Sequence, residues 1–204
     1  MIIDCHGHYT TTPPGVGSYR ESQKEAVSQD PVFKGVKGTV SVSDDEIRES
    51  IEENQLKLQQ ERGTDLTIFS PRASWMGHHI GNEWTSLYWT QHQNEIIRRV
   101  CDLFPKNFAP VAQLPQSPGV PPGKSVAEIR RTVETMGFVG INLNPDPSGG
   151  HWQDHSLAHK SFYPIYEVMC ELDIPAMVHV SASCNDSFHT TGSHYLGADT
   201  TGFQ

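Results

Sequence analysis

The sequence has no apolar run approaching the roughly 18–20 residues that are needed to cross a bilayer. Its N-terminus lacks a basic segment followed by an apolar stretch, so we expect no secretion signal and a cytoplasmic protein with no membrane partner. None of the four cysteines forms a C-x-x-C pair, which in that compartment predicts reduced thiols and no disulfide framework.

Basic residues are also scarce, because 15 Lys and Arg stand against 24 Asp and Glu, for a formal charge of −9. Phosphate binding requires clustered cations, so this charge argues against a nucleic-acid partner. A small anionic substrate is compatible with it, since a metal ion and one or two local cations can dominate the field inside a cleft. Histidine, by contrast, is abundant, with 11 residues.

Five short apolar runs bounded by Pro and Gly predict strands that are buried on both faces. They cover Ile2–Cys5, Thr64–Arg72, Phe108–Pro115, Phe138–Pro145 and Ile174–Ser181. The segments between them predict helices over Ser43–Gly63, Trp84–Pro105, Ser125–Gly137 and Tyr163–Asp173. Residues 11–42, rich in Pro, Gly and Ser, are interpreted as an insertion over the mouth of the first strand.

Two of the helices carry a Ser-x-x-Glu capping box at their predicted start, Ser43 with Glu46 and Ser125 with Glu128. In the first of these helices, the residues near helical spacing on one face are Ile47, Ile51, Gln55 and Leu58.

The alternation of strands and helices predicts an α/β fold with parallel strands and crossover helices. A TIM-type (β/α)8 barrel typically needs about 250 residues, whereas this sequence holds about five β/α units. We therefore expect a TIM-type barrel truncated after about five units, with residues 1–204 forming the N-terminal portion of a single barrel domain. An open α/β sheet is the alternative.

Histidines follow two of the predicted strands. His6 and His8 alternate at the end of the first strand, so both point to one face, and both imidazoles can reach one ion at about 2.0–2.1 Å. His179 lies in the C-terminal half of the fifth strand, at the same rim of the predicted barrel. Three imidazoles with an open position are typical of a catalytic zinc site, and we expect these three to share a metal ion.

Several motifs resemble one enzyme family. "IDCHGHY" and "HVSASCN" are similar to the branch of the amidohydrolase superfamily that holds metal-dependent decarboxylases and hydratases. Longer stretches resemble the 4-oxalomesaconate hydratases of bacterial aromatic-acid breakdown, namely "DLTIFSPRASWMGHHIGN", "LPQSPGV", "INLNPDPSGGHW" and "FHTTGSHYLGADTT". The resemblance implies a (β/α)8 barrel, a zinc ion, and reversible addition of water to a small unsaturated polycarboxylate such as 4-oxalomesaconate. It matches His6, His8 and His179 to the metal ligands, and Mn or Fe could use the same ligands.

Other polar residues are candidates for substrate binding. Arg72 follows the second strand and is interpreted as a carboxylate clamp, because its planar fork pairs with two oxygens; a surface Arg is the alternative. Asn142 and Asn144 alternate at the end of the fourth strand, where their amides either bind substrate oxygens or tie down the following turn. Ser181 and His79 are further candidates at the mouth, the latter beside His78.

The catalytic acid is less well matched. Cys184 follows His179 in a loop and could supply a proton, but the family pattern places its cysteine where this chain has Ser187. The family also draws a histidine from strand six and a glutamate base from strand eight, and a chain that ends at Gln204 cannot hold them. We therefore expect the 204-residue segment alone to be inactive.

Two other interpretations stay open. The first is a metal-dependent decarboxylase or hydrolase on the same scaffold, since function resides in the details of the site. The second is an inactive truncated fragment that binds metal or an intact homologue. Barrels of this kind often pair, so a homodimer is also an open expectation.

Overall fold

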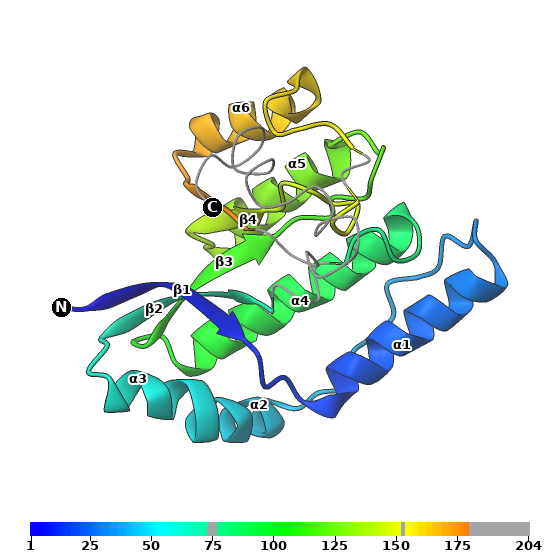
Figure 1. The fold of residues 1–204 in the computed structure, drawn as a ribbon. Coiled ribbons are helices and arrows are strands. Elements are labelled where there is room, and N and C mark those ends of the chain that lie inside the picture. The colour runs from blue at the N-terminus through cyan, green and yellow to red at the C-terminus, as the bar shows by residue number, and fades with distance from the viewer. Residues whose placement is uncertain (73–76, 152–153, 180–204) are drawn as a thin grey trace.

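A computed structural model describes residues 1–72, 77–151 and 154–179. Its centre is a five-stranded, all-parallel sheet in which the strands follow one another in chain order (Figure 1). The strands are β1 (Ile3–Tyr9), β2 (Leu66–Pro71), β3 (Phe108–Gln113), β4 (Gly140–Leu143) and β5 (Ala176–Val178). The family resemblance and the strand–helix alternation predicted this order, and the α/β architecture is confirmed.

Helices connect successive strands and cover the sheet. They are α1 (Pro14–Gln29), α2 (Asp44–Ile51), α3 (Lys57–Glu61), α4 (Glu83–Leu103), α5 (Gly123–Arg130) and α6 (Tyr163–Leu172). Single π turns follow α2 at Glu52–Leu56 and α5 at Arg131–Thr135, and a 3₁₀ turn at Lys160–Phe162 precedes α6. Within the described parts of the chain, no helix is both long enough and apolar enough to span a membrane.

The register shows that the sheet is curled as in a barrel. From strand to strand, His8 lies in line with Ser70, then Val111, then Gly140, and finally Pro175. The imidazole that His8 meets is nevertheless that of His179, four residues beyond Pro175. A stagger of about one residue per strand is the shear of an eight-stranded barrel. Five flat strands would instead leave their two edges about 19 Å apart.

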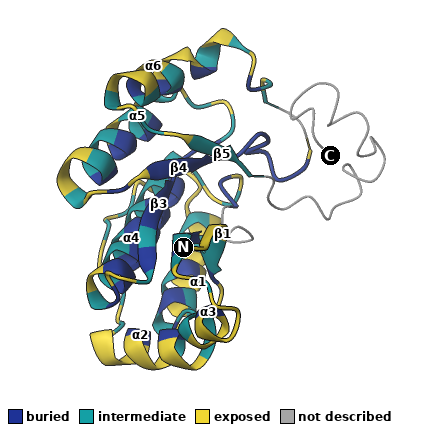
Figure 2. Cartoon of the chain, turned by 90° about the vertical axis from the view of Figure 1, so that its left-hand side faces the viewer, coloured by how far each residue is buried: buried dark blue, intermediate teal, exposed yellow. Residues whose placement is uncertain are grey.

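Strand β1 differs from the prediction of a strand buried on both faces. Its first four residues are exposed, because β1 forms one edge of the described sheet (Figure 2). The strand also extends to Tyr9, so that both histidines lie inside it. Between Asp4 and Gly7 the register shifts by one residue, which is a β-bulge. Bulges re-aim side chains and are over-represented next to active sites.

The segment 11–42 contains a helix that the sequence did not reveal. Helix α1 begins at Pro14, a residue tolerated in the first turn of a helix. It packs against α4, where the Arg20 guanidinium lies 4.9 Å from the centroid of the Trp89 ring and the Tyr19 ring stacks on the same indole. The segment was interpreted only as an insertion over the mouth of the first strand, and its first half is helical.

The helical segment between β1 and β2 confirms one prediction and corrects another. The capping box at Ser43 is present in both directions, since the Ser43 side chain accepts from the Glu46 amide and the Glu46 carboxylate accepts from the Ser43 amide. Beyond it, the π turn at 52–56 adds a residue and shifts the buried face. Leu58, expected to face the core, is 46% exposed, whereas Gln59 is buried.

The second predicted capping box, at Ser125, is wrong. Helix α5 begins after Pro122, and Ser125 inside it donates to the Pro115 carbonyl. Glu128 is 1% exposed and accepts hydrogen bonds from the side chains of Asn94 and Arg131. A Ser-x-x-Glu spacing caps a helix only at its first turn, and here the helix starts earlier.

Asn94 on α4 fixes the end of β3. Its side chain donates to the Gln113 carbonyl at 3.0 Å, accepts from the Gln113 amide at 3.0 Å and donates to the Glu128 carboxylate at 2.7 Å. All three residues are buried. The helix layer thereby determines where β3 ends inside the barrel.

We predict that Asn94→Leu lowers the free energy of unfolding by about 3 kcal/mol, because it leaves a buried amide, a buried carbonyl and a buried carboxylate each short of one partner. Urea unfolding followed by circular dichroism measures the change. Asn54→Leu is the matched control, since Asn54 makes one partly exposed bond to Ser50 and its loss is expected to cost less than about 1 kcal/mol. Equal losses in the two variants would contradict the prediction.

Candidate metal centre

Three histidines meet at the carboxyl end of the sheet. His6 and His8 come from β1, and His179 follows β5 directly, its amide donating to the Leu143 carbonyl. His8 Nε2 lies 2.9 Å from the Nε2 atoms of both His6 and His179. The three ring centroids are each 4.8 Å apart, with the rings edge to face. Among the residues that the structure describes, this is the one group of three with the donors for a metal ion.

The tautomer of His8 follows from its other nitrogen. Nδ1 lies 2.9 Å from the Pro71 carbonyl oxygen and 2.8 Å from Ser70 Oγ. A carbonyl can only accept, and the Ser70 hydroxyl donates to the Gly7 carbonyl. Nδ1 therefore carries the proton, and Nε2 presents its lone pair to the other two rings. Such a hydrogen bond on the far nitrogen is what orients a metal-binding histidine.

The protonation state also suits a metal. Burial, followed by the neighbouring His179, lowers the pKa of His8 to about 4, so its imidazole is neutral at pH 7. The single lone pair of His8 Nε2 cannot accept hydrogen bonds from both His6 and His179 along its axis. A divalent cation held by His6, His8 and His179 would instead accept a lone pair from each of the three imidazoles. The residues present fit a metal ion.

Beside the histidines, the inner face of the sheet lines an open cavity of about 560 Å³. His6, Ser70 and Asn142 contribute polar groups to it, and the remaining lining is mostly apolar. Asn142 is 2% exposed and its Nδ2 has no hydrogen-bond partner among the described residues. An amide donor left without a partner beside three convergent imidazoles fits a polar ligand.

The two asparagines predicted for β4 differ in role. Asn144 is buried, exchanges two backbone hydrogen bonds with the Gln116 side chain, and accepts the Asp146 amide on Oδ1 at 3.0 Å. That last bond is the turn-forming alternative considered for this residue. Of the pair, Asn142 faces the cavity.

The other predicted site residues are scattered. Arg72 follows β2 directly and is half-buried. His79 lies over the backbone of Gly149, and burial lowers its pKa. His78 points into the helix layer, where its Nδ1 lies 2.8 Å from Ser86 Oγ. Ser181 and Cys184 lie outside the described residues.

Sequence reasoning missed two inward-facing residues. Ser70 holds the His8 imidazole, and Gln113 ends β3 with a side chain that is 0% exposed. The signal was alternation, because Ser70 follows Ile68 by two positions and Gln113 follows Val111 by two. A polar residue that ends the inward row of a buried strand could have been chosen on that ground.

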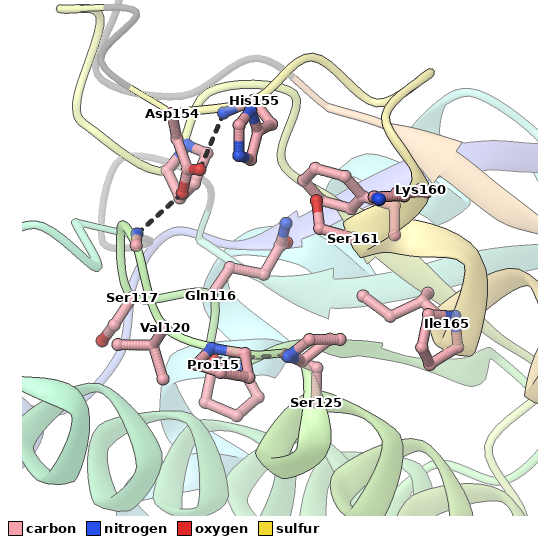
Figure 3. A pocket seen from close by; sticks show the side chains of 16 residues that line it. Pro115, Gln116, Ser117, Val120, Ser125, Asp154, His155, Lys160, Ser161 and Ile165 are labelled. Atoms are coloured by element: carbon pink, nitrogen blue, oxygen red, sulfur yellow. Dashed lines mark hydrogen bonds between the residues drawn. The ribbon is translucent and has the colours of Figure 1, made fainter.

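A second hollow of about 430 Å³ lies away from the histidines, between the loops after β3 and β4 (Figure 3). Its wall includes several prolines of these loops, together with Pro164 and Ile165 of α6. The Asp154 carboxylate ties the two loops together by accepting the amides of Gly119 and His155. None of the three clustered histidines lines it, so this hollow is separate from the candidate metal centre.

A staggered parallel sheet with convergent histidines at its carboxyl rim has the geometry of a TIM-type barrel whose rim could hold a metal ion. The amidohydrolase family model matches residues 3–204. The chain belongs to the amidohydrolase family.

Two hydratases are similar along the whole chain. The 2-keto-4-carboxy-3-hexenedioate hydratase of Sphingobium sp. is 52% identical over 206 residues, covering 100% of this chain and 59% of that protein. The crystal structure of 4-oxalomesaconate hydratase from Rhodopseudomonas palustris is 49% identical with a TM-score of 0.81, covering 100% of this chain and 56% of that one. The chain thus spans less than two thirds of the length of either relative.

Decarboxylases share the fold at lower identity. The 5-carboxyvanillate decarboxylase of Novosphingobium aromaticivorans, solved with bound manganese, has a TM-score of 0.66 and is 18% identical over 98% of this chain and 58% of its own. At this identity the likeness extends to the fold alone.

We predict that His78 makes the protein less stable in acid. Burial, and then the nearby Arg20 charge, lowers its pKa to about 3, whereas an imidazole in the unfolded chain titrates near 6.5. Below pH 6.5 the unfolded state binds a proton that the folded state does not. The free energy of unfolding therefore falls as the pH drops toward 3, by up to about 1.4 kcal/mol per pH unit from this group.

Urea unfolding at pH 7, 6 and 5 measures this slope. His78→Asn is expected to flatten it by about one proton. Ser86→Ala removes the partner and keeps the imidazole, so its slope should follow the wild type. Parallel curves for wild type and His78→Asn would contradict the assignment.

Proposed function

We propose that the protein is a hydro-lyase that adds water across the carbon–carbon double bond of a small unsaturated polycarboxylate. The compounds named for the two hydratase relatives, 2-keto-4-carboxy-3-hexenedioate and 4-oxalomesaconate, define the substrate class. The observation that carries the proposal is the convergence of His6, His8 and His179 on one point, in a chain that matches both hydratases over its full length.

We propose that these three imidazoles hold a divalent metal ion, with zinc as the first candidate and manganese or iron as alternatives. When bound, such an ion supplies Lewis-acid polarisation of a substrate or water oxygen. Neighbouring decarboxylases with bound manganese support metal dependence in this fold.

The remaining assignments concern the chain's own side chains. Arg72 and Asn142 would orient substrate carboxylates at the rim, and His79 and Ser181 would contribute further polar contacts. Cys184 would deliver the proton to the carbon that does not receive the hydroxyl group. We further propose a cytoplasmic enzyme that has no nucleic-acid or membrane partner and forms homodimers.

The proposed reaction predicts loss of the conjugated double bond. The protein that carries this sequence, purified at full length, should bleach the ultraviolet absorbance of 2-keto-4-carboxy-3-hexenedioate and incorporate one oxygen from ¹⁸O-labelled water. His179→Ala should reduce kcat/KM by at least about 10³-fold, the equivalent of several kcal/mol of transition-state stabilisation. Release of carbon dioxide from carboxylated aromatic acids, without hydration, would favour the decarboxylase alternative instead.

The hydrogen bond from His8 to Ser70 predicts a change in metal affinity. Ser70→Ala should weaken metal binding by about 10- to 100-fold, because the His8 imidazole loses one of the partners that orient it. Chelator competition followed by elemental analysis measures the affinity. Ser86→Ala is the matched control, since Ser86 contacts His78 Nδ1 at the same 2.8 Å distance away from the three histidines. Equal affinity in both variants would exclude an orienting role for Ser70.

A further inference from the structure

Gln113 is a buried amide on the inner face of the barrel. Its side chain is 0% exposed, and neither Oε1 nor Nε2 has a hydrogen-bond partner among the described residues. Side chains alternate along a strand, so Gln113 shares the face of Val111, which lines the cavity beside the histidines. Ala112 between them belongs to the hydrophobic core under the helices. Gln113 therefore points into the barrel.

The register places Gln113 between two residues already considered for carboxylate binding. In the β3–β4 pair, Gln113 lies directly opposite Asn142, whose Nδ2 is also without a described partner. The β2–β3 pair joins Phe69 to Pro110, and its continuation places Arg72 beside Gln113. Adjacent strands are about 4.8 Å apart. Three N–H-bearing side chains thus form a row about 10 Å long across β2, β3 and β4.

The barrel stagger places the same residue level with the metal ligands. The strand register places Val111 on β3 in line with His8 on β1. Because each strand is offset by about one residue, the residues at the same height as His8 along the barrel axis are Gln113 on β3 and His179 on β5. In TIM barrels, alternate strands contribute the side chains of one layer. Gln113 therefore lies in one layer with His8 and His179.

Other buried polar atoms without partners lie elsewhere. Gln93 Nε2 and Thr90 Oγ1 on α4 are examples, and both are in the helix layer. Gln113 differs from them in two ways, because both of its polar atoms lack partners and its strand neighbour lacks one as well. A buried amide costs stability when unpaired, and a ligand beside the metal ligands would satisfy it.

We infer that Gln113 is a substrate-binding residue that donates its amide N–H to a carboxylate of the substrate, in a row with Arg72 and Asn142. Gln113 Nε2 and Asn142 Nδ2 are donors without a partner among the described residues, and an anionic group with several oxygens can accept from both. This inference rests on the proposed function and extends it, since it assigns a further contact for a small polycarboxylate.

Two substitutions test the inference in the full-length, metal-loaded protein. Gln113→Met keeps the volume and removes the amide, and it should weaken binding of propane-1,2,3-tricarboxylate by about 10- to 100-fold. Gln113→Glu keeps the shape and replaces the donor with a like charge, so it should weaken binding further. Titration calorimetry measures the dissociation constant, and steady-state kinetics with 2-keto-4-carboxy-3-hexenedioate should show a matching rise in KM.

The stability of the variants toward urea distinguishes a substrate-binding role of Gln113 from a structural one. Gln113→Met should unfold at the same or a higher urea concentration than the wild type, because it removes an unpaired buried amide. Gln93→Met is the matched control, with the same expected stability and unchanged tricarboxylate binding. Binding by Gln113→Met within twofold of the wild type, or binding lost in proportion to stability, would overturn the inference. If Gln113→Met fails to fold, the Gln113→Glu comparison decides, since unchanged binding there contradicts a carboxylate ligand.

Failure of the proposed reaction and failure of the proposed Gln113 contact give different combinations of hydration activity and tricarboxylate binding. Hydration by the wild type with no effect of Gln113→Met would overturn the role of Gln113 alone. Tricarboxylate binding that depends on Gln113, without hydration of any tested substrate, would overturn the proposed reaction and support the binding residue. A wild type that neither binds the tricarboxylate nor hydrates would overturn both.

Discussion

The approach of His179 to His8 is the contact on which the candidate site depends. The two residues are 171 positions apart and belong to the first and last strands of the described sheet. They meet because each strand is offset by about one residue from the last, which curls the sheet until its edges face each other across the barrel. The site is thus a consequence of strand register. A flat sheet of the same strands would separate the same imidazoles by more than their reach.

Both layers of the fold support that geometry. On the inner side, Ser70 and the Pro71 carbonyl hold the His8 ring in one tautomer. On the outer side, Asn94 holds the end of β3 through the backbone of Gln113. Neither set of bonds contacts a ligand. The first set occupies His8 Nδ1 and leaves Nε2 facing the other two histidines, whereas the second satisfies the backbone of Gln113 and leaves its side chain available.

The sequence predicted what depends on local pattern. The order of strands and helices, the cap at Ser43 and the shared face of His6 and His8 follow from spacing alone. The second Ser-x-x-Glu spacing predicted a helix start at Ser125 that is wrong, because the start of α5 depends on where the β3–α5 loop ends. The π turn in the helix after β1 exchanged Leu58 for Gln59 at the core, and a periodicity of 3.6 residues cannot anticipate an inserted residue.

The position of Gln113 in the candidate site could not be predicted from the sequence, because it depends on how the strands pair. In the sequence it is one polar residue at the end of "FAPVAQ", next to a proline-rich loop. Its proximity to Asn142 follows from the pairing of two strands, and its height level with His8 follows from the stagger of two more. A buried amide with no partner is an unfavourable feature of a folded protein. Its position in one layer with two of the candidate metal ligands gives a physical reason for its presence, because a bound anion would supply the missing acceptor.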